Sequence, residues 1–291
     1  MSPRSPDYSN YKTVTSPELF KVKWEPFYRE GLLRSTALKQ SFKHFADVSY
    51  GSSIFQTLDI YLPDDLRKDT SCLIFLHGGA FREGHPAHYG FIGKPYLDRG
   101  FGFISAGYRL APEAFYPDHV DDVAVLMKWV YDHLPRYGLN AKRIVVSGHS
   151  SGALMVALAS VRTDWQKAKG LPQDIINYVV LAGANYDHRT EFPENLVLNP
   201  SRREEGTVLC NMQRVPGCAT IVFGVNEINT GDGRRFERSG RPLAEELKAR
   251  GSNVEIFALD TDHQGTCRVL CDENSAVFAA VVASLKQAKE R

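Results

Sequence analysis

Short apolar runs rich in β-branched and aromatic residues recur along this chain of 291 residues, and they limit its possible folds more than any other feature. Such runs are typical of strands. We expect strands at residues 44–50, 55–61, 72–76, 101–108, 143–147, 178–182, 219–223 and 254–259. The first two are joined by the turn-like Gly51-Ser52-Ser53, which predicts an antiparallel hairpin.

Helical patterns separate most of the later runs, at residues 120–134, 152–162, 241–250 and 274–289. This alternation predicts an α/β fold with a mostly parallel eight-stranded sheet and helices on both faces. The length suits one large core, so we expect a single domain over residues 1–291. In a sheet of this kind the active site lies at the carboxyl ends of the strands.

Two segments interrupt the alternation, residues 1–43 before the first strand and residues 185–217 between the sixth and seventh strands. Each is a candidate for a small cap over the site, and the alternative is a docked arm and a surface loop. The loop after the third strand contributes three more rings, those of His85, His88 and Tyr89. These side chains either reach the rim of the pocket or, more simply, lie on the surface.

The composition argues against several classes of partner. The formal net charge is +1, which leaves no electrostatic footprint for nucleic acid or an anionic membrane. The polar N-terminus lacks the apolar core of a signal peptide, and no run of about 18 apolar residues suggests a membrane span. The five cysteines are irregularly spaced and show no zinc pattern. We therefore expect a cytoplasmic protein without a metal site.

The pentapeptide Gly148-His149-Ser150-Ser151-Gly152 follows one expected strand and precedes a helix. This is the context that a nucleophile turn requires, because a tight turn leaves no room for side chains at its glycines and lifts the serine hydroxyl above the sheet. Alone the motif is weak evidence, since a Gly/Ser turn can simply cap a helix. The glycine spacing selects Ser150 over Ser151 as the predicted nucleophile.

A second glycine turn, HGGAF at residues 77–81, follows the third strand. Successive small residues let the backbone approach a ligand closely, and an acyl-transfer site needs N–H donors for the developing oxyanion. The predicted oxyanion-hole donors are the N–H groups of Gly79, Ala80 and Ser151, with Gly78 as the alternative to Ala80. We interpret His77 as a support for this loop and not as the catalytic base.

Three motifs occur in order along the chain, HGGAF at 77–81, YRLAPE at 108–113 and GHSSG at 148–152. Together they resemble the hormone-sensitive-lipase-like esterases, a branch of the α/β hydrolases. The sequence LDIYLP at 58–63 is similar to the entry strand of kynurenine formamidases and related carboxylesterases. The resemblance implies the α/β-hydrolase fold. Two positions depart from the patterns of these families. Ala80 stands where the lipase-like branch usually has Gly. The formamidase pattern has an aromatic pair near this position, often ending in Trp, which this chain lacks.

In this fold the nucleophile, the acid and the histidine follow one another along the chain. His263 follows the last expected strand and is the predicted general base, because an ordinary histidine pKa of about 6.5 suits proton transfer near neutrality. Glu227 lies just after the seventh strand and is the preferred acid, since a strand end is a rigid support. Counting back from the next helix points to Asp232 instead, and both remain candidates.

These residues predict a serine hydrolase that cleaves a small-molecule carboxylic ester or amide through an acyl-enzyme, without a cofactor. One alternative is an aryl-formamidase acting on N-formylkynurenine, and another is a hydrolase of specialised metabolism. A non-catalytic small-molecule receptor on the same fold is a further alternative, and it predicts a damaged triad. The last strand and final helix are a candidate homodimer edge.

Overall fold

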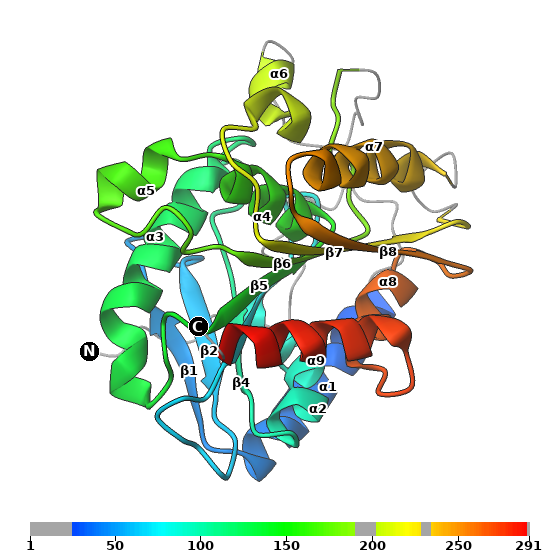
Figure 1. Cartoon of the computed structure of the whole chain (residues 1–291). Helices are drawn as coiled ribbons and strands as arrows, with labels where there is room; N and C mark the ends of the chain where they lie inside the picture. The colour runs from blue at the N-terminus through cyan, green and yellow to red at the C-terminus, as the bar shows by residue number, and fades with distance from the viewer. Residues whose placement is uncertain (1–24, 190–201, 228–233, 290–291) are drawn as a thin grey trace.

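The computed structural model describes residues 25–189, 202–227 and 234–289, and Figure 1 shows their arrangement. Within these ranges eight strands form one sheet in the order β1-β2-β4-β3-β5-β6-β7-β8. The strands are β1 His44–Ser49, β2 Thr57–Tyr61, β3 Cys72–Leu76, β4 Gly102–Ala106, β5 Ile144–His149, β6 Tyr178–Ala182, β7 Cys218–Gly224 and β8 Asn253–Leu259. Strand β2 is antiparallel to both of its neighbours and every other pair is parallel. The predicted mostly parallel eight-stranded sheet is confirmed.

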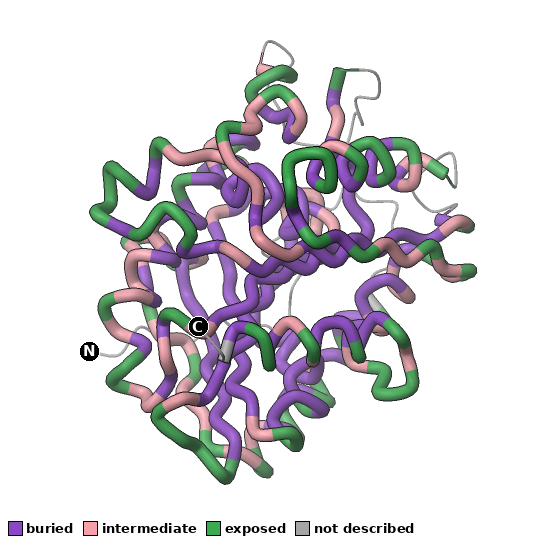
Figure 2. Tube along the Cα trace, viewed as in Figure 1, coloured by how far each residue is buried: buried purple, intermediate pink, exposed green. Residues whose placement is uncertain are grey.

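The central strands are buried at every position, which explains why their sequences are nearly continuous apolar runs. Figure 2 shows these buried strands between helices whose outer surfaces are exposed. On one side of the sheet α3, α4 and α7 pack on residues such as Ile74 and Val146. On the other side α1, α2 and α9 pack on residues such as Phe75 and Val180. The two cores leave the strand ends free to form a site.

The helices in the described ranges include the four expected ones and several shorter ones. The α-helices are α1 Glu25–Ser41, α2 Lys94–Leu97, α3 His119–His133, α4 Ser151–Val161, α5 Asp164–Lys169, α6 Arg203–Gly206, α7 Arg235–Ala249, α8 Gly265–Arg268 and α9 Ala276–Lys289. The 3-10 helices are η2 Pro86–His88, η3 Gly90–Gly93, η4 Leu134–Tyr137, η6 Val208–Asn211 and η8 Val269–Cys271. None of the helices in these ranges has the length and apolar character needed to cross a membrane.

The two candidate cap segments are described in part. Residues 25–41 form α1, which belongs to the helix layer on one side of the sheet (Figure 1). Within the 185–217 segment, residues 202–217 contain α6 and η6. Two hydrogen bonds join this part of the segment to other loops. The Tyr116 hydroxyl donates to Gly206 O at 2.7 Å, and the N–H of Val208 donates to Tyr186 O at 3.0 Å. Residues 1–24 and 190–201 lie outside the described residues.

Helix α7 begins at Arg235, earlier than the residue 241 expected from the sequence. Pro242 favours a start near residue 241, because proline is common in the first turn of a helix. In the structure Pro242 lies inside the helix, and the turn before it contains Ser239 and Gly240, which are poor helix formers. Tertiary packing of Phe236 and Leu243 stabilises this turn despite the local sequence.

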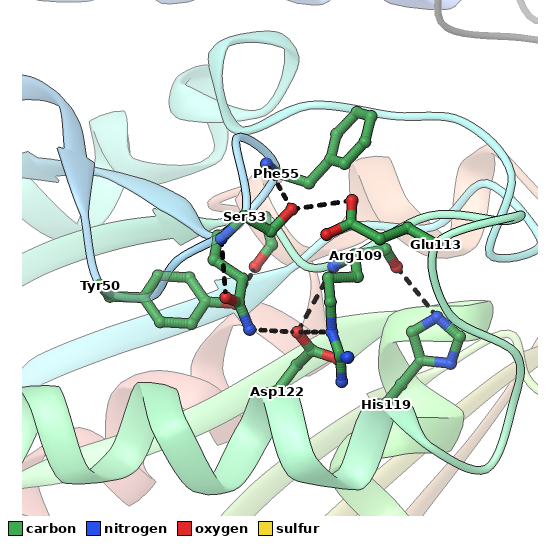
Figure 3. Close-up of polar contacts among 9 residues, drawn as sticks. Tyr50, Ser53, Phe55, Arg109, Glu113, His119 and Asp122 are labelled. Atoms are coloured by element: carbon green, nitrogen blue, oxygen red, sulfur yellow. Dashed lines mark hydrogen bonds and ion pairs between the residues drawn. The ribbon is translucent and has the colours of Figure 1, made fainter. Parts of the chain in front are cut away.

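A cluster of polar side chains around the buried Asp122 holds the segment after β4 in place (Figure 3). The carboxylate of Asp122, in the first turn of α3, is fully buried and accepts bonds from Arg109 Nε at 3.0 and 3.1 Å and from Arg109 Nη2 at 3.0 Å. Gln56 Nε2 donates to the same carboxylate at 2.6 Å. Nearby, Ser53 Oγ donates to Glu113 Oε2 at 2.9 Å. These contacts hold the YRLAPE segment between the turn that precedes β2 and helix α3.

Replacing Asp122 should therefore be costly. We expect Asp122→Ala to lower the free energy of unfolding by about 3 kcal/mol, because Arg109, whose side chain is only 26% exposed, loses its counter-charge. Urea denaturation measures the change. The control is Lys128→Ala, which breaks an exposed ion pair with Asp132 and should cost less than about 0.5 kcal/mol. Equal costs for the two variants would contradict this account.

Candidate active site

Ser150 lies between the end of β5 and the first residue of α4, in the strand–turn–helix context predicted for it. Its φ of 54° and ψ of −121° are rarely adopted by residues with side chains, so the turn holds it under strain. A Cβ at Gly152 would lie 2.2 Å from Leu76 O, and one at Gly148 would lie 2.4 Å from Gly152 C. Gly148 is therefore required for the turn to close on the start of α4, and Gly152 for α4 to pack against the end of β3.

His263 lies in the loop after β8, and its Nδ1 is 2.5 Å from Glu227 Oε2. The side chain of His263 is 3% exposed and that of Glu227 is 0% exposed. A carboxylate can only accept here, so Nδ1 carries the proton and Nε2 keeps its lone pair. The other oxygen, Glu227 Oε1, accepts the N–H of Gly224 at 2.6 Å. The structure thus places Glu227 against His263, and Asp232 lies outside the described residues.

The end of β6 brings Ser150 and His263 to the same place. The N–H of Ser150 donates to Ala182 O at 2.8 Å, which anchors the nucleophile turn on β6. At the next residue, a Cβ on Gly183 would lie 3.1 Å from His263 Nδ1. The carboxyl ends of β5, β6 and β7 therefore gather the three predicted residues at one edge of the sheet, as expected for a parallel sheet.

His149 supports the His263 loop. Its Nε2 lies 2.8 Å from His263 O and 3.2 Å from Thr266 Oγ1, and Thr266 Oγ1 donates to the same carbonyl at 2.7 Å. Because a carbonyl only accepts, Nε2 of His149 carries its proton. Burial, followed by the neighbouring His263, lowers the pKa of His149 well below its ordinary value. A neutral ring thus lies 4.6 Å from the ring of His263.

The HGGAF loop has the unusual backbone that its small residues predict. Gly79, Ala80 and Phe81 all have positive φ, at 132°, 51° and 63°. A Cβ at Gly78 would lie 3.0 Å from the Cβ of Ser150, so this loop passes directly beside the serine. In the described ranges the N–H groups of Gly79 and Ala80 donate to no backbone carbonyl. The N–H of Ser151, which opens α4, has no acceptor within its helix.

His77 is a support for this loop in the structure. Its Nδ1 donates to Gly78 O at 2.7 Å, and its ring lies against those of Tyr89 and Tyr108 with centroids 5.7 and 4.5 Å away. Burial lowers the pKa of His77 to about 3. The Tyr108 hydroxyl donates to His77 O at 2.8 Å, so its 3.0 Å contact with Ser151 Oγ uses the serine proton. Ser151 is therefore committed to a structural bond.

The expectation that His85, His88 and Tyr89 lie on the surface is wrong. All three are buried, with exposed fractions of 4%, 3% and 1%. Helix α1 covers them, and the ring of Tyr28 stacks on His88 at 5.0 Å. Sequence patterns could not show this, because the covering residues lie more than fifty positions upstream.

Sequence reasoning also missed the roles of Tyr108, His149 and Phe236. Tyr108 belongs to the YRLAPE motif, whose sequence does not indicate the contacts of this side chain. His149 occupies a variable position of the nucleophile motif. Phe236 stacks on His263 at 5.1 Å, and no local sequence signal marks it. No group of three or more His, Cys, Asp and Glu side chains in the described part of the chain is arranged to hold a metal ion.

Comparisons with known proteins agree with this architecture. Residues 58–187 match the family model described as BD-FAE. A truncated carbohydrate esterase from gut microbiota superposes with a TM-score of 0.71 at 17% identity, over 86% of this chain and 97% of that chain. The Pyrobaculum calidifontis esterase superposes with a TM-score of 0.66 at 19% identity, over 91% of each chain. The chain has the α/β-hydrolase fold.

Curated relatives of this chain include a kynurenine formamidase and an esterase. The kynurenine formamidase of Danio rerio is 24% identical over 84% of this chain and 82% of that protein. The esterase LipC of Mycobacterium tuberculosis (strain ATCC 25618 / H37Rv) is 29% identical over 55% of this chain. The chain spans only 40% of LipC. The predicted resemblance to esterases and kynurenine formamidases is confirmed.

The buried histidines make the fold sensitive to acid. Burial lowers the pKa of His77 to about 3 and of His88 and His119 to about 4, against about 6.5 in an unfolded chain. Between pH 4 and 6.5 the unfolded chain binds protons that the folded chain does not, so stability rises with pH across this window. Burial raises the pKa of Glu83 to about 7, which has the opposite slope, but this is one group against three.

We therefore expect the free energy of unfolding to fall by a few kcal/mol between pH 6.5 and pH 4, as measured by urea denaturation. The fall should be smaller in His119→Phe, which removes one of the three titrating rings. Equal stability of the natural protein at the two pH values would show that these histidines are not buried as neutral groups.

Proposed function

We propose that the protein is a serine hydrolase that cleaves a carboxylic ester of a small molecule, with Ser150 as nucleophile, His263 as general base and Glu227 as the triad acid. The observation that carries the proposal is the buried contact of 2.5 Å between His263 Nδ1 and Glu227 Oε2, at the sheet edge where Ser150 is held in a strained turn. A turn that only capped a helix would need neither the strain nor the buried pair.

In the proposed reaction Glu227 accepts the Nδ1–H of His263, so Nε2 carries no proton and takes the proton of Ser150 Oγ as the serine attacks the substrate carbonyl. The N–H groups of Gly79, Ala80 and Ser151 donate to the oxyanion that forms, with Gly78 as the alternative donor. The imidazolium then protonates the leaving group. Water, activated by the same ring, hydrolyses the acyl-enzyme. These steps require no metal ion or organic cofactor.

The surroundings of the pair favour this proton transfer. The buried carboxylate of Glu227 stabilises the imidazolium that forms on His263, and water does not screen the two charges there. His149 remains neutral 4.6 Å away, so it adds no repulsion when His263 becomes charged. Phe236 stacks on the ring of His263 at 5.1 Å.

A second candidate is hydrolysis of an aryl formamide, by the same steps with an amine as the leaving group. It is favoured by the similarity to the Danio rerio kynurenine formamidase, which extends over most of both chains. A substrate panel separates the two candidates. It consists of p-nitrophenyl esters of increasing acyl length together with N-formylkynurenine, each assayed for kcat/KM.

The triad assignment is tested by four variants assayed on the best substrate of that panel. Ser150→Ala should lower kcat by more than about 1000-fold, and Glu227→Gln by a similar factor because the ring loses its tautomer and its counter-charge. Asp232→Asn should stay within about 3-fold of the natural protein. The matched control is Ser151→Ala, which keeps its N–H and should stay within about 10-fold. A large loss in Asp232→Asn with a small one in Glu227→Gln would assign the acid to Asp232.

A further inference from the structure

Helix α1 contacts the loop that carries the proposed oxyanion donors, residues 77–84, here called the oxyanion loop. The Tyr28 hydroxyl on α1 donates to Glu83 Oε1 at 3.1 Å, and both side chains are buried. The N–H of Glu83 in turn donates to Gly79 O at 3.1 Å. One hydrogen-bonded path therefore leads from α1 to the residue whose N–H is proposed to hold the oxyanion.

Aromatic packing reinforces this contact. Phe27, next to Tyr28 on α1, lies against the ring of Tyr89 with centroids 5.9 Å apart. Tyr89 in turn stacks on His77, with an interplanar angle of 11°. Tyr28 stacks on His88. The helix thus supports the oxyanion loop through packed rings as well as through the carboxylate of Glu83.

The same helix contacts the segment that carries the proposed general base, residues 260–268, here called the histidine loop. Glu30 on α1 accepts two bonds from Arg268, from Nη1 to Oε1 and from Nη2 to Oε2, both at 2.8 Å. Arg268 also lies over the ring of Phe27 at 5.1 Å. It is the last residue of α8, and Thr266 in that helix donates to His263 O. Figure 1 shows α1 beside α8.

We infer that Tyr28 and Glu30 are positioning residues, and that α1 couples the oxyanion loop to the histidine loop so that the donors and the base keep their spacing during the reaction. The inference rests on the proposed function. The two contacts lie two positions apart on one helix, so a shift of the helix moves both loops together. It makes α1 a second support of the histidine loop, in addition to His149.

Two variants break the link at either end without removing packing. Tyr28→Phe deletes one hydroxyl and keeps the ring on His88, and Glu30→Gln removes the charge that pairs with Arg268. The control is Lys39→Met, because Lys39 also anchors α1, through an ion pair of 2.8 Å with the buried Asp59 of β2, but contacts neither loop. Kinetics are measured on an activated ester, with active sites counted by phosphonate titration so that misfolded protein is excluded.

Each end variant should lower kcat by about 5-fold with KM nearly unchanged, because the donors and the base act in the transition state. The kcat of the double variant should fall by less than about 10-fold, which is well below the product of the two single effects. The reason is that the loss of either contact already uncouples the two loops. Lys39→Met should lower the melting temperature while kcat stays within about 2-fold. When Lys39→Met is combined with Tyr28→Phe, the effects of the two substitutions on kcat should multiply.

Multiplicative losses in the Tyr28→Phe and Glu30→Gln double variant would overturn the coupling. An unchanged kcat in either single variant, or a loss that disappears after active-site counting, would also overturn it. These failures are distinct from a failure of the proposed function, in which Ser150→Ala would retain turnover.

Discussion

The site depends on the missing side chain at Gly152. This residue faces the carbonyl of Leu76 at the end of β3, and a Cβ on residue 152 would lie only 2.2 Å from that oxygen. This contact draws the first turn of α4 onto β3 and leaves Ser150 strained at the top of the turn. Because the HGGAF loop begins directly after β3, the same contact sets that loop beside the serine. The absence of one side chain therefore brings Ser150 and the HGGAF loop together.

Burial sets the chemistry of the histidines around this turn. His77 and His149 are neutral because water is excluded, and each holds a backbone carbonyl of a functional loop through an N–H. His263 differs from them in having a buried carboxylate, Glu227, as its partner. Burial disfavours a charged imidazole at His77 and His149. The fold thereby gives one histidine a buried carboxylate partner and the other two backbone carbonyls.

Local patterns predicted the sheet well, because buried parallel strands are short apolar runs that differ visibly from the polar turns between them. Ser150 and His263 could be chosen as candidates for the same reason, because they follow strands that the sequence marks clearly. The choice between Glu227 and Asp232 depended on the path of a loop, which no local pattern encodes. The contact of Glu227 with His263 spans 36 positions of the chain.

Helix α1 shows the limit of sequence patterns in another way. Its buried residues Phe27, Tyr28 and Leu38 do not form a clear apolar stripe, so the segment was expected as an arm or a cap. Its tertiary packing against η2 and η3 also explains why His85 and His88 are buried. The residues that tie α1 to both loops are polar, and polar contacts between distant segments leave no periodic signal in the sequence.

The central claim is that Ser150 receives the acyl group. Its most direct test is to react the protein with a fluorophosphonate and to locate the adduct by peptide mass spectrometry. The account predicts a single adduct on Ser150, formed much more slowly in Glu227→Gln and absent in Ser150→Ala. Full labelling of Ser150→Ala, or an adduct on Ser151 in the natural protein, would contradict it.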